Sequence, residues 1–218
     1  IEASSIEATG LNQGGRILIG NDASNGTLPF ALFTSLDSMT SLNASQLNPN
    51  STNQAGGYIE TSGLTLSMLS SINVGRGGMW LIDPNDIIID SALAGNIAST
   101  LAGSNVSIST SGCSPSVSGC TSTPGGNGNI LINSAINASG TGSLTLNPDA
   151  GGAIYIAANI TTGGAQTYNG NVVLSGAVTL TTTNSDVTIT GSVSSGYYQI
   201  VQIGATSGDT WQSVNGLR

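Results

Sequence analysis

The side chains that could do chemistry in this chain are few. The sequence has 218 residues with no His or Lys, three basic residues and eleven acidic ones. The commonest general base and the usual amine nucleophile are therefore missing. Paired carboxylates, as in glycoside hydrolysis, are what remains, but most Asp residues here stand in predicted turns. We expect no enzyme and no cofactor.

Three carboxylates cluster in the sequence at Asp83, Asp86 and Asp90. Ca²⁺ is bound by six to eight oxygen ligands, so the cluster raises the possibility of a calcium site. The spacing matches no calcium loop, however, and Pro84 beside Asp83 is typical of a turn. We expect turn residues rather than a metal site.

Glu60 is one of three Glu and lies within a predicted strand. A ligand contact is one interpretation of it. The other is structural, either capping a turn or pairing with Arg76, because one nearby guanidinium is enough to satisfy a carboxylate. We favour a structural role.

Cys113 and Cys120 are the two cysteines. In an extracellular chain such a pair suggests a disulfide that closes a short loop, and two free thiols are the alternative. Two Cys without His are too few for a zinc site, so we expect no metal.

The charge balance excludes several partners. Net charge is -8 and charged residues make up 6% of the chain, so a basic patch for nucleic acid is not expected. An acidic surface also disfavours anionic lipid, and no apolar run approaches the length of a membrane helix. Because the chain begins at Ile1, we expect a processed product or a fragment.

Short strands must position these residues. Apolar residues alternate with polar ones in many runs of three to five residues, which is the pattern of strands with one buried face. The runs include Ile130–Ile132, Ile154–Ile156 and Val172–Leu174. Such spacing permits a β-sandwich or a parallel β-helix. Mid-sized aliphatics, recurrent turn Asn and only 4% aromatic residues favour a β-helix with coils of about twenty residues.

The chain divides into three parts by regularity. Residues 1–56 are predicted to form irregular first rungs or a cap, and within them residues 28–42 suggest a short helix or a packed cap. Residues 57–203 are predicted to form β-helix rungs, with a helical turn within residues 92–102. Residues 204–218 are expected to be a tail or to continue into further rungs.

One stretch has an individual signature. Gly-Gly-Tyr-Ile-Glu-Thr-Ser-Gly at residues 56–63 is followed by Val-Gly-Arg-Gly-Gly and then by Trp-Leu-Ile-Asp-Pro-Asn-Asp-Ile-Ile-Ile at residues 80–89. This pairing resembles a motif of large bacterial exoproteins of the filamentous-haemagglutinin type, which are exported by two-partner secretion. The resemblance covers roughly residues 50–203. Residues that we take as its structural motif are Gly57, Glu60, Arg76, Trp80, Asp83, Pro84 and Asp86.

The resemblance implies an all-β, right-handed parallel β-helix that forms a rod on the cell surface and acts in adhesion or secretion. Its partners would be glycans or proteins of a host or neighbouring cell, and an outer-membrane transporter of the parent protein. Asn48-Pro49-Asn50 lacks the Leu that follows in the family's secretion domain. We therefore expect a shaft segment.

Two other functions stay open. A self-assembling extracellular filament or matrix subunit would associate through the ends of the solenoid, where sheet edges are free to pair. A carbohydrate- or ice-binding module would use a flat Thr array, for which Thr181, Thr182, Thr183, Thr188 and Thr190 are the candidates.

Overall fold

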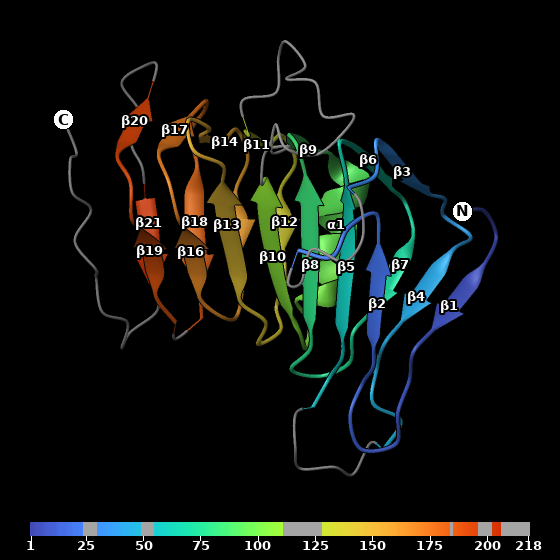
Figure 1. The fold of residues 1–218 in the computed structure, drawn as a ribbon. Coiled ribbons are helices and arrows are strands. Elements are labelled where there is room, and N and C mark those ends of the chain that lie inside the picture. The colour runs from blue at the N-terminus through green and yellow to red at the C-terminus, as the bar shows by residue number, and fades with distance from the viewer. Residues whose placement is uncertain (24–29, 49–54, 111–127, 184, 196–201, 206–218) are drawn as a thin grey trace.

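The computed structural model describes residues 1–23, 30–48, 55–110, 128–183, 185–195 and 202–205. Nearly all regular structure in these ranges is β-strand, and every strand pairing is parallel (Figure 1). This excludes the antiparallel sheets of a β-sandwich. The sequence prediction of an all-β chain with parallel strands is therefore confirmed at that level.

The largest sheet has seven strands. In spatial order from one edge these are β2 (Arg16–Ile19), β5 (Tyr58–Gly63), β8 (Met79–Pro84), β10 (Asn105–Thr110), β13 (Leu144–Pro148), β16 (Gln166–Tyr168) and β19 (Val187–Ile189). The order follows the sequence without inversion, so each strand lies beside the one that precedes it in this sheet.

Four smaller sheets are built in the same way. One contains β9 (Ile87–Ile89), β11 (Ile130–Ile132), β14 (Ile154–Ile156), β17 (Val172–Leu174) and β20 (Val193–Ser195), and another contains β12 (Ile136–Asn137), β15 (Ile160–Thr161), β18 (Thr179–Thr182) and β21 (Gln202–Ala205). The others are β1 (Ser5–Glu7) with β4 (Ser41–Asn43) and β7 (Ser71–Asn73), and β3 (Phe33–Leu36) with β6 (Thr65–Met68).

The chain visits these sheets in turn. From β13 it passes to β14 in the five-stranded sheet, to β15 in the four-stranded sheet, and returns to the seven-stranded sheet at β16. Strand partners are therefore about 20 residues apart, as Leu144 and Gln166 or Ile154 and Val172 illustrate. Residues at one position of consecutive layers lie side by side.

The core runs along the whole stack of strands. Val106 and Ile108 of β10 lie between Trp80 and Ile82 on one side and Leu144 and Leu146 on the other, and all six side chains are fully buried. Alternate residues of each strand point inward, so each layer contributes two or three aliphatic side chains per strand. This is the long, thin core that evenly spread apolar residues predict.

Asparagine side chains tie successive layers together at the turns. The Oδ1 atoms of Asn129, Asn159 and Asn171 accept the backbone N–H groups of Ala153, Thr179 and Ser192, at 3.0, 2.8 and 3.1 Å. Asn169 also donates to Asn147 at 2.8 Å. The amides satisfy backbone donors where a strand begins, which explains why Asn recurs at these positions.

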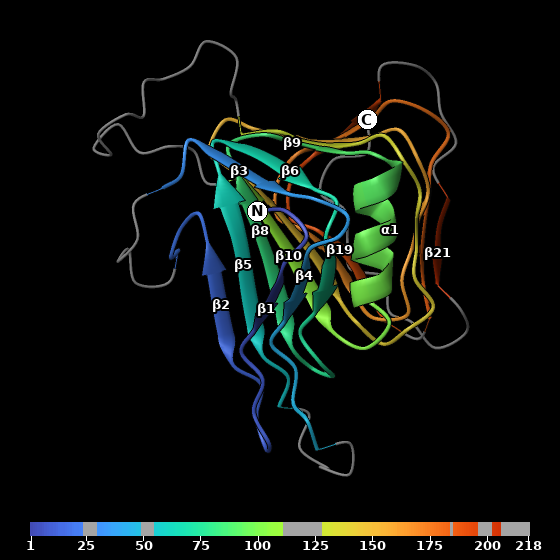
Figure 2. The ribbon, with the colours of Figure 1, turned by 90° about the vertical axis from the view of Figure 1, so that its right-hand side faces the viewer.

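The single helix among the described residues, α1 (Ser91–Thr100), packs against β7 and β12 (Figure 2). Asp90 caps its first turn by accepting the Leu93 N–H at 2.9 Å. Leu93 and Ile97 are four residues apart and both face the core. The helical turn expected within residues 92–102 is thus part of a ten-residue helix.

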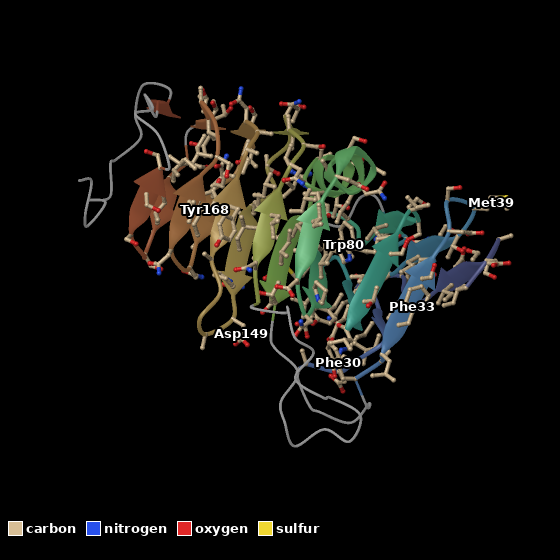
Figure 3. All side chains as sticks on the ribbon, turned by 90° about the horizontal axis from the view of Figure 1, so that it is seen from above. Phe30, Phe33, Met39, Trp80, Asp149 and Tyr168 are labelled. Atoms are coloured by element: carbon tan, nitrogen blue, oxygen red, sulfur yellow. The ribbon has the colours of Figure 1, made fainter. Side chains whose placement is uncertain are left out.

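Residues 28–42 differ from expectation. The described part of this segment forms β3 and begins β4, with neither a helix nor a packed cap. Leu36 and Leu42 are buried, whereas Phe33 and Met39 are 65% and 71% exposed at the edge of the molecule (Figure 3). Large apolar residues suggested packing, but strand alternation directs Phe33 outward. Residues 1–48 therefore contribute strands to the same sheets as the later residues, and β21 spans the predicted boundary at residue 204.

Candidate functional site

The densest group of charged side chains in the described residues lies on the outer face of β2, β5 and β8. In the parallel register Arg16 stands beside Tyr58, and Ser62 stands beside Asp83. Ile59 and Trp80, one position along, point to the core. Tyr58, Glu60, Ser62 and Asp83 consequently share the outer face.

Glu60 is fully buried although it points away from the aliphatic core. Its Oε1 accepts the Ala23 N–H at 2.9 Å and the Ser62 hydroxyl at 3.1 Å, and its Oε2 accepts the Tyr58 hydroxyl at 3.1 Å. Burial raises the pKa of Glu60, with a smaller contribution in the same direction from the charge of Asp83. The three hydrogen bonds lower it, but burial prevails.

Two further carboxylates complete the group. Asp83 is 1% exposed, and its Oδ2 accepts the Asn21 amide at 3.3 Å. Asp22 is 2% exposed and pairs with Arg16 at 2.7 Å. The Arg16 guanidinium lies 5.2 Å from the centre of the Tyr58 ring, a cation–π distance. Arg16 therefore balances the charge of Asp22, with Tyr58 below it.

This geometry supports structure more than catalysis. Glu60 and Asp83 are 0% and 1% exposed, so a substrate could not reach either carboxylate in the closed structure. Of the two structural roles predicted for Glu60, the structure shows it holding a turn at Ala23. Arg76 is exposed in the turn before β8 and is not among the hydrogen-bond partners of Glu60.

Asp83, Asp86 and Asp90 do not converge on one point. Asp83 ends in the polar group with Asn21 and Asp90 caps α1, while Asp86 accepts the Asn129 N–H at 2.7 Å. Across the described residues no group of three acidic, His or Cys side chains could hold a metal ion. Asp83 lies in β8 and not in the turn, which Asn85 and Asp86 form.

Trp80 is a core residue. Its side chain is fully buried within the molecule, and its indole N–H donates to the Thr61 hydroxyl at 3.0 Å (Figure 3). Pro84 ends β8, beside Gly63. Gly57 is needed for close packing, because a Cβ there would lie 2.0 Å from the carbonyl oxygen of Ala44. The predicted motif residues therefore stabilise one region where three strands meet, except Arg76.

Cys113 and Cys120 lie outside the described residues, so the predicted disulfide stays a prediction.

The proposed Thr array is divided between two sheets. Thr181 and Thr182 belong to β18 and Thr188 to β19, and Thr182 is fully buried. Thr188 instead stands beside Thr167, which stands beside Thr145 and then Ser107. These four half-exposed residues form a hydroxyl column on the outer face of the seven-stranded sheet. Sequence alone missed it because its members are 21 to 38 residues apart.

A buried polar group in the core was also not predicted. Gln166 and Tyr168 point inward from β16 and are fully buried. The Tyr168 hydroxyl donates to Gln166 Oε1 at 2.7 Å, and Gln166 Nε2 donates to the Thr181 carbonyl at 2.8 Å. Burial raises the pKa of Tyr168. The signal was Gln at an inward position of a strand, where the other layers carry aliphatics.

Comparisons with protein families, with curated proteins and with solved structures give no match. Among the described residues, no helix has the length and apolar character needed to cross a membrane.

Proposed function

We propose that this chain is a structural and adhesive segment of a secreted or surface-displayed bacterial exoprotein, folded as a right-handed parallel β-helix. The observation that supports it most is the order in which the chain visits three sheets, returning to each after about 20 residues in parallel register. Each such circuit would be one coil. The motif at residues 56–63 and 80–89, which resembles filamentous-haemagglutinin-type proteins, supports the assignment to that class.

A coil stack suits a mechanical role. Each layer pairs with the layers next to it, so stability grows with the number of layers and no central core limits the length. Buried aliphatic residues in every layer and Asn bridges between layers resist local opening. Such a shaft would hold a binding surface away from the cell. Receptors would be glycans or proteins of another cell, and the parent protein would leave through an outer-membrane transporter.

Non-enzymatic function is part of the proposal. The carboxylates that come closest to a catalytic arrangement, Glu60 and Asp83, are buried and engaged in hydrogen bonds. No residue in the described part of the chain supplies the imidazole or amine that most hydrolases and lyases use.

Adhesion is tested directly with beads coated with the protein. We expect the coated beads to bind cultured epithelial or bacterial cells above the level of beads coated with an unrelated protein of equal net charge. Equal binding of the two bead types would reject the adhesive role. Small-angle scattering tests the rod separately, because a β-helix predicts an elongated particle and a sandwich a compact one.

A hydroxyl-binding surface is the second candidate function. Parallel pairing sets the residues of the column Ser107, Thr145, Thr167 and Thr188 about 4.8 Å apart, which gives a flat and regular row of hydroxyls. Such a row could bind ice or a polysaccharide. Thermal hysteresis and glycan-array binding should then be lost in Thr167→Tyr and kept in Thr161→Tyr, which alters a different sheet. Wild-type protein inactive in both assays would reject this candidate.

Filament formation is the remaining alternative. The outer edges of β2 and β19 have no neighbouring strand among the described residues, so end-to-end pairing of copies is available. Fibres that lengthen with protein concentration would favour the filament, and a monomer at every concentration would favour the shaft.

A further inference from the structure

Three consecutive residues cross the outer face of the seven-stranded sheet, and each binds a different strand. The Asn21 amide donates to Asp83 of β8 at 3.3 Å, Asp22 accepts from Arg16 of β2 at 2.7 Å, and the Ala23 N–H donates to Glu60 of β5 at 2.9 Å. We call residues 21–23 the strap. Its tethers are ionisable side chains on every strand it crosses.

We propose that the strap is a pH-sensitive device: it lies closed over this face when Glu60 carries a proton, and it lifts when Glu60 ionises. The proton comes from water and returns to it, so no other reactant is needed. Nothing in the adhesive role requires such a switch, and the proposal does not depend on that role.

The charges that face Glu60 explain why it is the sensitive group. Asp83 faces it from β8, Tyr58 from its own strand, Arg16 from β2 and Asp22 from the strap. Arg16 is held by Asp22 and stacks on Tyr58. Glu60 itself receives only neutral hydrogen-bond donors, from Ala23, Tyr58 and Ser62. Its negative charge is thus buried beside that of Asp83 without a cation of its own.

The direction of the effect follows from proton linkage. Burial raises the pKa of Glu60 in the closed structure, and the neighbouring Asp83 adds to the rise. Lifting the strap returns the carboxyl to water, where its pKa approaches the ordinary value. The closed form therefore binds the proton more tightly than the open form. Closure is strongest at acidic pH and weakens as the pH rises from the ordinary value through the raised one.

Protonation keeps the tethers intact. The carbonyl oxygen of a neutral Glu60 can still accept the Ala23 N–H, and its hydroxyl can donate to the Tyr58 oxygen. Removing the charge also removes its repulsion with Asp83. A Gln side chain at position 60 would offer the same acceptor and a donor in place of the carboxyl proton, so Glu60→Gln mimics the closed, protonated state at every pH.

Hydrogen exchange of the Ala23 amide, measured by NMR from about pH 4 to about pH 8 and corrected for its intrinsic rate, tests the proposal. In the wild type the opening constant should rise up to about tenfold per pH unit between the two pKa values of Glu60 and then level off. Glu60→Gln should remove this rise and keep Ala23 as protected as in the acidic wild type. Glu2→Gln, which changes an exposed carboxylate, should behave as the wild type does.

Two results would overturn the proposal. One is an opening constant for Ala23 that does not change with pH in the wild type. The other is a Glu60→Gln variant that retains the wild-type pH dependence. Should this variant fail to fold, the carbon-13 shift of the Glu60 carboxyl in the wild type decides: it must titrate at the pH where Ala23 exchange levels off, and titration at the ordinary pKa of Glu would refute the switch.

Discussion

The indole N–H of Trp80 donates a hydrogen bond of 3.0 Å to the hydroxyl of Thr61, on the neighbouring strand of the same sheet. Both side chains are fully buried, and they stand on the core side of β8 and β5. The largest side chain of the core thus has its one polar atom satisfied within the core. Thr61 is the partner that makes a Trp possible in this layer.

Removing the Thr61 hydroxyl should therefore destabilise the protein. Thr61→Val keeps the shape and leaves the indole N–H buried without an acceptor, which costs about 1–3 kcal/mol. The free energy of unfolding from urea denaturation measures this loss. Thr145→Val, on the outer face, should change it by less than about 0.5 kcal/mol. Equal losses in the two variants would contradict the role of Thr61.

Adjacent isoleucines of β9 test which face is the core. Ile89 is fully buried, whereas Ile88 is 59% exposed. Ile89→Ala should lower the free energy of unfolding by about 2–5 kcal/mol, because it removes buried methylene groups and leaves a cavity. Ile88→Ala should cost less than about 1 kcal/mol. A larger loss for Ile88 would mean that the register of β9 is shifted by one residue.

Asparagine bridges between layers should contribute measurably to stability. The Asn159 amide oxygen accepts the Thr179 N–H at 2.8 Å, and Asn159→Ala should cost about 0.5–1.5 kcal/mol in the free energy of unfolding. Asn137 is exposed on β12, the strand that pairs with β15 just after Asn159. Asn137→Ala is the matched control and should be nearly neutral. If both variants lose the same stability, the bridge is not the cause.

Two glycines should respond in opposite directions to the same change. A Cβ on Gly57 would lie 2.0 Å from the Ala44 oxygen and 2.5 Å from the Gly15 oxygen, so Gly57→Ala should cost about 1–3 kcal/mol or more. Gly95 lies within α1 with open space around it, and Gly95→Ala should stabilise the protein by roughly 0.5–1 kcal/mol. Thermal denaturation followed by circular dichroism distinguishes the two outcomes. A neutral Gly57→Ala would show that the layers are not closely packed there.

Local pattern was sufficient to predict much of the fold. Ile130, Ile132, Ile154 and Ile156 are inward and buried as their alternation predicts, because the side-chain period of a strand is fixed by its backbone. The strand-turn-strand at residues 79–89 and the helix after Asp90 follow from local signals too, a Pro-containing turn and a cap. Their causes lie within a few residues of each other.

The sequence by itself determined which residues form strands and which face of most strands is apolar, and its resemblance to a class of exoproteins suggested the role that we propose. Only the tertiary structure decided that Glu60 and Asp83 are buried beneath residues 21–23, that Thr188 stands beside Thr167 rather than Thr181, and that Phe33 is exposed. Glu60 and Asn21 are far apart in the chain. Which distant residues meet depends on the register between layers, and register is set by the lengths of the turns and the packing of the whole stack.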